Sequence, residues 1–161
     1  MGIFVARHGV SEANDQGNPA FGSRKAHLLE KGRVQARELG SRLPVDFGID
    51  PSTEPVAVSE FTRTIETAEE AGFLVINRYA VLDEVKHGLD LEGFQKMKET
   101  RVLPLHAMRA GETTLNSPPE ERIWVCHGLK IAAMCQILGV YQDGERLFQK
   151  FCDVRYLPIG D

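Results

Sequence analysis

Short apolar runs alternate with helical periodicities along the first half of the chain. Runs rich in β-branched and aromatic side chains predict buried strands. Apolar residues at intervals of three and four predict helices, of which one ends before Pro44 and another before Gly72. Strands that alternate with helices favour a parallel sheet with crossover helices. The predicted strands are 3–6, 56–59 and 73–76, and the predicted helices are 30–43 and 62–71.

The second half of the chain begins with a stretch of looser patterning. Residues 92–101 and a few residues near Met108 predict short helices, and the Ser-Pro-Pro at 117–119 predicts a break. We interpret residues 85–122 as a short insertion over the sheet edge and the site. Regular patterning then returns with a strand at 123–126, a helix at 129–138 and a last strand at 154–159.

Length and charge narrow the classes of function. The 161 residues fit a single domain spanning 1–161, and the net charge of -4 argues against a general nucleic-acid binder, which needs a basic field. No apolar stretch reaches the roughly 20 residues that cross a bilayer. The N-terminus lacks the apolar core and cleavage site of a secretion signal. We therefore expect a cytoplasmic protein with neither a membrane nor a nucleic acid as partner. The pattern indicates no oligomeric state.

The three cysteines are widely spaced in apolar segments and form no CxxC pair. This spacing predicts reduced residues of the core. Cys126 stands beside His127, but we interpret it as the end of a buried strand rather than as a nucleophile.

Two predicted strands end in the same way. His8 and His127 each follow the last residues of a strand, and each precedes a glycine, which lets the backbone approach a ligand closely. In open α/β sheets ligands bind beyond the carboxyl ends of the strands, so both imidazoles are expected to face one crevice. Arg7 and Arg63 add two permanent cations whose planar forks match phosphate oxygens. The sequence therefore predicts a site for a phosphoryl group.

Five segments in this order resemble the histidine phosphatase superfamily, also called the phosphoglycerate mutase-like family. Its first motif, Arg-His-Gly followed by Ser, Glu and Asn, is similar to residues 7–14. The resemblance covers residues 3–139, is thinner between 92 and 123, and implies a three-layer αβα sandwich with a mainly parallel twisted sheet and a reduced cap insertion. The other four segments resemble the family's conserved helix start (28–36), its second arginine (59–68), its proton donor (82–88) and its second histidine (125–128).

The resemblance implies a role for each matching residue. His8 would attack phosphorus and form a phosphohistidine that water hydrolyses, and His127 would assist it. Glu84 would protonate the leaving oxygen and then activate water. The implied phosphate ligands are Arg7, Arg63, His127, Asn14 and a backbone N–H after Gly128. Candidates for contact with the rest of the substrate are Ser11, Arg24 and Lys25. No metal and no other cofactor is implied.

Simpler structural roles compete with these assignments. Arg63 could pair with Glu60 or Glu66 near the start of its own helix, and Asp83 stands beside Glu84. A metal site at His8 is disfavoured, because His8 has no ligand-spaced partner and the adjacent arginine repels divalent cations. The remaining histidines, His27, His87 and His106, match no motif and are expected in loops or on the surface.

The expected reaction is hydrolysis of a phosphomonoester on a small phosphorylated metabolite or a phosphoprotein. The 42 residues between Glu84 and His127 predict a small cap and an open pocket. An open pocket disfavours phosphoglycerate mutase activity, since a mutase must hold its intermediate away from water. Two alternatives are a protein phosphohistidine phosphatase, in which Glu84 would be dispensable, and a non-catalytic phosphate-binding protein on the same fold.

Overall fold

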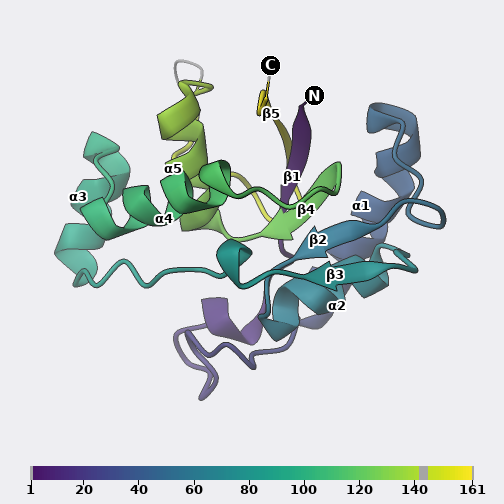
Figure 1. The fold of residues 1–161 in the computed structure, drawn as a ribbon. Helices are drawn as coiled ribbons and strands as arrows, with labels where there is room; N and C mark the ends of the chain where they lie inside the picture. The colour runs from purple at the N-terminus through teal and green to yellow at the C-terminus, as the bar shows by residue number, and fades with distance from the viewer. Residues whose placement is uncertain (1, 142–144, 161) are drawn as a thin grey trace.

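The computed structural model describes residues 2–141 and 145–160, which fold around a five-stranded sheet (Figure 1). The strands are β1 (Ile3–Arg7), β2 (Val56–Val58), β3 (Ile76–Arg78), β4 (Ile123–Cys126) and β5 (Val154–Leu157). The helices are α1 (Glu30–Phe47), α2 (Thr62–Glu70), α3 (Leu91–Thr100), α4 (Leu105–Asn116) and α5 (Gly128–Leu138), with short 3₁₀ turns η1 (Glu12–Asn14) and η2 (Ala80–Leu82). The strand order is β3-β2-β4-β1-β5, and only β5 runs antiparallel to its neighbour within this described sheet. The mainly parallel α/β sandwich is thereby confirmed.

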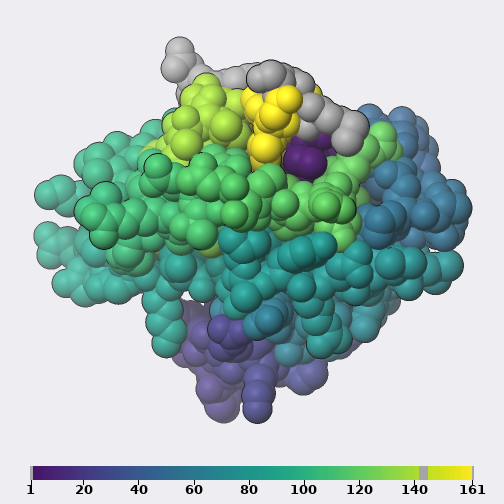
Figure 2. Space-filling model, in the orientation of Figure 1, coloured from purple at the N-terminus to yellow at the C-terminus, as the bar shows by residue number. Residues whose placement is uncertain are grey.

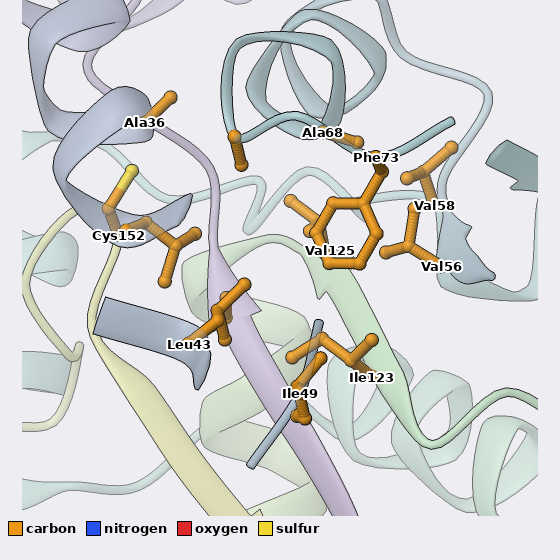
Figure 3. Packing of buried hydrophobic residues seen from close by; sticks show 13 residues of the cluster. Ala36, Leu43, Ile49, Val56, Val58, Ala68, Phe73, Ile123, Val125 and Cys152 are labelled. Atoms are coloured by element: carbon orange, nitrogen blue, oxygen red, sulfur yellow. The ribbon is translucent and has the colours of Figure 1, made fainter. Parts of the chain in front are cut away.

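Side chains of the central strand β4 alternate between the two helical layers. Ile123 and Val125 belong to a buried cluster with residues of α1 and α2, and Figure 3 shows both among the apolar side chains of that cluster. Trp124 and Cys126 belong to a second cluster with residues of α5. A parallel strand that is buried on both faces has no polar side, which explains its continuous apolar sequence. Parallel pairing of β1 with β4 holds the carboxyl ends of these two strands next to each other.

Helix α1 continues through Pro44 to Phe47, so the prediction that it ends before this proline is wrong. Leu43 is fully buried, and the ring of Phe47 packs against that of Phe4 with their centroids 5.3 Å apart. These contacts stabilise a last turn that lacks one backbone hydrogen bond at the proline. The helix ends at Gly48, which adopts the left-handed conformation with φ of 62°.

The third strand lies later in the sequence than the apolar run at 73–76 predicts. Strand β3 pairs Ile76 with Val56, whereas Leu74 and Val75 are exposed and precede it. Phe73 is buried in the core as part of the turn after α2. The prediction failed because β3 is an edge strand with partly exposed residues, which an apolar run does not mark. The last strand also ends earlier than predicted, at Leu157.

The insertion is more helical than its sequence suggests. Around Met108 the structure has the three-turn helix α4, which packs against α5. Apolar residues of α3, α4 and α5 share a third buried cluster, so the insertion enlarges the helical layer on the α5 face of the sheet. In the space-filling view the insertion forms the left side of the molecule, and the loop at 9–29 protrudes at the bottom (Figure 2). No helix in the described ranges has the length and apolar character to cross a membrane.

Candidate active site

The two strand-end histidines lie side by side. His8 follows β1 and His127 follows β4, and these strands are parallel neighbours whose carboxyl ends meet at one edge of the sheet. The centroids of the two imidazole rings are 5.2 Å apart. Both residues are buried, with 3% of His8 and 0% of His127 exposed. The structure therefore brings together the two histidines that the sequence singled out.

The contacts of His8 define its protonation state. Nδ1 lies 2.7 Å from the carbonyl oxygen of Gly9, an acceptor, so Nδ1 carries the proton and donates it. On the other side of the ring, Nε of Arg63 donates to Nε2 at 3.2 Å, which requires a lone pair on Nε2. Burial, followed by the charges of Arg63 and Arg7, holds the pKa of His8 well below its usual value. The ring is thus neutral near pH 7, and Nε2 is unprotonated.

Close backbone packing fixes the loop that follows His8. A Cβ atom at Gly32, in the first turn of α1, would overlap the carbonyl oxygen of Val10, and a Cβ at Gly9 would overlap the carbonyl of Gly32. The N–H of Gly9 also donates to Oγ1 of Thr67 at 3.0 Å. Both glycines therefore allow the contact that positions the carbonyl acceptor of His8.

Substitution Gly32→Ala is expected to lower the free energy of unfolding by about 1–3 kcal/mol, because the added methyl group meets backbone rather than a movable side chain. Urea unfolding measures this loss. Gly17→Ala is the matched control in the same region of the chain, since the nearest atom to its Cβ lies at an ordinary 3.5 Å. Equal stability of the two variants would contradict the close contact.

Arg63, in the first turn of α2, faces the site. Its Nη1 donates to the carbonyl of Ser23 at 3.0 Å, and its Nε donates to His8 as described. The alternative partner Glu66 is instead engaged with Arg33 and with His27, an exposed loop residue. Burial lowers the pKa of Arg63 to about 10, so the guanidinium stays charged near pH 7.

Arg7 approaches the site from the end of β1. Its Nη1 donates to the carbonyl of Gln149 at 2.9 Å, and a Cβ at Gly128 would lie 3.2 Å from its Cζ and Nε. The glycine at the start of α5 thus gives the guanidinium room. Burial lowers the pKa of Arg7 to about 10, which leaves it charged. Its Nε is buried and finds no hydrogen-bond partner within 2–141 and 145–160.

Of the two ring nitrogens of His127, Nε2 has a hydrogen-bond partner among the described residues and Nδ1 has none. Its Nε2 lies 2.8 Å from Oγ of Ser59, which follows β2, and its ring contacts that of Phe61 at 4.8 Å. Its Nδ1 is buried and, like Nε of Arg7, has no partner among the residues that the structure describes. Buried polar atoms without a partner are rare in proteins. Two of them beside His8 indicate a place for a polar ligand.

Glu84 and Asp83 point to different partners. The carboxylate of Glu84 accepts from the N–H groups of Leu129 and Lys130, both at 3.1 Å, at the start of α5. Burial raises its pKa despite these hydrogen bonds. Asp83 instead accepts from Arg24 at 2.9 Å and from the N–H of Glu60. Of the two neighbours, Glu84 is therefore the carboxyl group next to the His127 segment.

The contacts of Glu84 also change one expectation about α5. The resemblance implies that a backbone N–H after Gly128 binds phosphate, but the N–H groups of Leu129 and Lys130 donate to Glu84 instead. Lys130 of α5 matches none of the sequence motifs. Its side chain is buried, and its ammonium group lies 3.2 Å from the carbonyl of Val81, which ties α5 to the segment before Glu84. The signal for it is the single charged residue of a mostly apolar helix.

The remaining candidates lie in the loop at 9–29. Asn14 is exposed, and its Oδ1 accepts from the N–H and the hydroxyl of buried Ser11, so this pair stabilises the loop itself. Arg24 forms ion pairs with Glu60 and Asp83. Lys25 is exposed to solvent. The structure thus places these four residues around the site without bringing them into contact with His8 in the described part of the chain.

A segment that no motif predicted closes one side of the site. The ring of Phe151 lies 5.8 Å from that of His8, and Cζ of Arg7 lies 4.0 Å from the same phenyl ring. The segment 146–153 follows α5 and combines basic with aromatic residues, which is its only sequence signal. The three cysteines are buried and unpaired, and burial raises the pKa of the Cys126 thiol, so no reactive thiolate is expected there.

A neutral histidine at the carboxyl edge of a parallel sheet, near buried Arg63 and half-buried Arg7, defines an anion site of the kind that handles phosphoryl groups. A family model described as histidine phosphatase superfamily (branch 1) matches residues 3–123, and the chain belongs to this superfamily. Membership indicates a phosphoryl-transfer enzyme of the phosphatase or mutase type. No curated protein sequence matches the chain.

Solved structures share the fold at low sequence identity. The protein TTHB049 from Thermus thermophilus is 21% identical with a TM-score of 0.71, covering 99% of this chain and 95% of that one. The product of open reading frame Rv3214 from Mycobacterium tuberculosis is 20% identical with a TM-score of 0.64, covering 96% and 89%. A phosphoserine phosphatase from Entamoeba histolytica, solved with 3-phosphoglyceric acid, is 15% identical with a TM-score of 0.63, covering 96% and 89%. The histidine phosphatase fold is thereby confirmed.

Proposed function

We propose that this protein hydrolyses phosphomonoesters through a phosphohistidine formed on Nε2 of His8, without a metal ion. The observation that carries the proposal is the pair of buried, unpartnered atoms, Nε of Arg7 and Nδ1 of His127, beside an unprotonated ring nitrogen. A phosphoryl group supplies acceptors for both atoms and an electrophile for the nitrogen. Superfamily membership and the fold shared with a phosphoserine phosphatase support the reaction class.

In the first step Nε2 of His8 attacks phosphorus as the bond from phosphorus to the leaving oxygen breaks. The hydrogen bond from Nδ1 to the carbonyl of Gly9 keeps the proton on the far side of the ring and stabilises the cationic phosphohistidine that forms. Water then attacks the phosphorus and releases inorganic phosphate, which returns the electron pair to Nε2. Covalent catalysis of this kind replaces one difficult displacement by two easier ones.

The charged groups of the site oppose the negative charge of the phosphoryl oxygens. Arg7 and Arg63 keep their charge near pH 7, and both are largely removed from water. Hydrogen-bond donors that are fixed in advance at the transferring group are the main source of catalysis in phosphoryl transfer. His127, held by Ser59 on Nε2, offers Nδ1 for the same purpose. With two arginines in place, the reaction needs no divalent cation to neutralise the phosphate.

Glu84 is proposed as the general acid for the leaving oxygen and the base for water. Glu84→Gln is expected to lower kcat/KM for an alkyl phosphate by about 10²–10³-fold, because an alkoxide needs a proton to leave. For para-nitrophenyl phosphate, whose leaving group is a stable anion, the loss is expected below about tenfold. Because burial raises the pKa of Glu84, activity on the alkyl ester should decline as pH rises through that raised value. This decline should be absent from the pH profile of Glu84→Gln.

Asp83→Asn serves as the control for Glu84, since Asp83 is bonded to Arg24 and Glu60. Equal losses on both esters in Glu84→Gln would contradict the proton-donor role. A phosphohistidine peptide tests the alternative substrate class. If the phosphohistidine peptide is hydrolysed far faster than either ester, and Glu84→Gln does not change the rate of its hydrolysis, the protein is a phosphohistidine phosphatase.

Trapping the intermediate tests the proposal directly. The enzyme is mixed with radiolabelled phenyl phosphate in the presence of a metal chelator, quenched in alkali, where phosphohistidine is stable, and digested for mass spectrometry. The expected result is label on the peptide that contains His8, lost on acid treatment and absent from His8→Asn. Vanadate is expected to inhibit turnover. Hydrolysis without label on His8, or hydrolysis that requires added metal, would overturn the mechanism.

A further inference from the structure

The side chain of Lys130 is a buried cation to which the proposed reaction gives no role. Lys130 is the single charged residue of α5, and only 4% of it is exposed. Both hydrogen-bond partners that the structure gives its ammonium group are carbonyl oxygens, that of Val81 at 3.2 Å and that of Ala110 at 3.4 Å. Neutral acceptors satisfy N–H donors but do not balance a charge. Because an apolar side chain of similar volume would fill this place at lower cost, the charge points to a role beyond packing.

The ammonium group of Lys130 lies where three elements of the chain meet. Val81 belongs to η2, Ala110 to α4 and Lys130 to α5. The hydroxyl of fully buried Thr114, also in α4, lies 2.8 Å from the carbonyl oxygen of Val81 and 3.0 Å from that of Ala110. These four residues form one polar cluster, the junction cluster, in which two side-chain donors share two carbonyl acceptors. The junction cluster joins the insertion and α5 to the turn that precedes Glu84.

Close packing of α4 on α5 fixes the position of the junction cluster (Figure 1). The buried residues of α4 are Ala107, Gly111 and Thr114, whose spacing places them on one face of the helix. A Cβ atom at Gly111 would lie only 2.9 Å from the Cβ of Ala133 in α5. Glycine therefore allows the two helices to approach closely at this point, and the carbonyl of the preceding residue, Ala110, reaches the ammonium group of Lys130.

Lys130 contacts the Glu84 segment with both its main chain and its side chain. Its backbone N–H donates to Oε1 of Glu84 at 3.1 Å. Its ammonium group donates to the carbonyl of Val81, in the turn that leads into Glu84. The main chain therefore holds the carboxyl group itself, and the side chain holds the turn that carries it. A movement of η2 away from α5 would withdraw Glu84 from the start of that helix.

Several charged or titratable groups act on Glu84 from the elements packed around it. They include Arg7 from β1, Arg63 from α2, Cys126 from β4 and Lys130 from α5. Burial raises the pKa of Glu84, and the charges of Arg63 and Lys130 act in the opposite direction. Burial raises the pKa of the Cys126 thiol, so that group is neutral near pH 7. Because the two arginines are assigned to the phosphoryl group, Lys130 is the cation of this set that acts on the acid alone.

We propose that Lys130 is a positioning residue for Glu84, holding its turn through the carbonyl of Val81 and stabilising its ionised carboxylate with a buried positive charge. The inference rests on the proposed function, in which Glu84 gives its proton to the leaving oxygen and later takes one from the attacking water. Between these two transfers the carboxylate is ionised in a site that is largely removed from water. A cation that does not contact the phosphoryl group stabilises this state and leaves the arginines to the phosphate. Thr114 shares the positioning of the turn but contributes no charge.

Titration of the Glu84 carboxyl group tests the role of the charge without any turnover. Protein labelled with carbon-13 at the glutamate carboxyl groups is titrated by NMR, and the signal of Glu84 is the one that Glu84→Gln lacks. In Lys130→Met the midpoint is expected to rise by about 0.5–1 pH unit, because a cation near the carboxylate is removed. Lys130→Gln, which keeps an N–H donor but no charge, should give the same rise. Lys86→Met is the matched control, since it removes an exposed lysine two residues from Glu84 and should leave the midpoint unchanged.

The rates on two esters separate the positioning from the charge. Thr114→Val is expected to lower kcat for an alkyl phosphate by about threefold to tenfold, while the decline of activity at alkaline pH stays in place. Lys130→Met should show a similar fall, and its alkaline decline should move to higher pH with the midpoint of Glu84. On para-nitrophenyl phosphate, whose leaving group needs no proton, both variants should stay within about threefold of the native rate. Thr113→Val is the matched control, because this exposed hydroxyl bonds to the carbonyl of Arg109 in its own helix.

The two measurements distinguish failure of this inference from failure of the proposed function. Circular dichroism verifies that the variants fold, which is expected of Lys130→Met because it replaces a buried charge by an apolar side chain of similar volume. A Glu84 midpoint that is the same in Lys130→Met, Lys130→Gln and the native protein, or equal losses on the two esters, would overturn the role of Lys130 and leave the phosphatase function intact. A raised midpoint in a protein that hydrolyses neither ester would reject the phosphatase function and keep the link between Lys130 and Glu84.

Discussion

His8→Asn is expected to lower kcat for para-nitrophenyl phosphate by on the order of 10⁵-fold, because the variant has no nitrogen that can form the phosphoryl bond. Asparagine keeps a donor that can reach the carbonyl of Gly9, which accepts from Nδ1 at 2.7 Å in the native protein. The loop after β1 should therefore keep its conformation. Phosphate release measured at high enzyme concentration, with circular dichroism to verify folding, gives the result.

The substitution His8→Asn should lower kcat and leave the affinity for phosphate nearly unchanged. Arg7 and Arg63 remain in His8→Asn, so the affinity for inorganic phosphate is expected to change by less than about tenfold. His106→Asn is the matched control, since this exposed imidazole bonds only to the carbonyl of Lys86 among its described contacts. A folded His8→Asn protein with more than a small fraction of native activity would show that another group is the nucleophile.

The strand ends explain why the centre of the site could be predicted from sequence. A central strand such as β4 is buried on both faces, so it reads as a continuous apolar run, and the polar residue that ends the run is at the sheet edge. His8 and His127 both follow such runs. Parallel pairing of β1 with β4 then brings the two histidines together, so their proximity can be predicted from the strand ends alone.

Elements away from the sheet centre depend on contacts that the local sequence does not contain. Pro44 predicts the end of α1, but the helix continues because Leu43 before the proline and Phe47 after it both pack on the core. The edge strand β3 has a single apolar residue, Ile76, packed against the core, so its position follows from pairing with Val56 and not from the run that precedes it. The local sequence pattern therefore predicts strands that are buried on both faces. It fails to predict the bounds of elements that are set by tertiary contacts.

The same distinction applies to the site. Asn14 and Ser11 match a motif, yet they bond to each other and stabilise their loop. Lys130 and the segment 146–153 match no motif, although the first contacts the Glu84 segment and the second contacts His8. Their positions depend on how α5 and the following chain fold back onto β1, which is information about the tertiary structure. Such residues are found only when the fold is known.

Arg63→Gln is expected to lower kcat/KM for para-nitrophenyl phosphate by about 10³–10⁴-fold, since it removes a buried cation that donates to the reacting nitrogen. Arg24→Gln is the matched control. The two guanidinium groups lie at similar distances from the ring of Phe61, 4.8 Å for Arg63 and 4.6 Å for Arg24, but Arg24 is exposed and paired with carboxylates. Its replacement should cost less than about tenfold.

The pH profile separates a role of Arg63 at His8 from general loss of binding. The positive charge of Arg63 is one cause of the lowered pKa of His8, so its removal should raise that pKa while burial and Arg7 continue to lower it. Protonated His8 cannot attack phosphorus, so the acid limb of kcat/KM should move to higher pH in Arg63→Gln and stay in place in Arg24→Gln. The loss in Arg63→Gln should then be larger in acid than in alkali. A uniform loss at every pH would mean that Arg63 holds the phosphate without controlling the nucleophile.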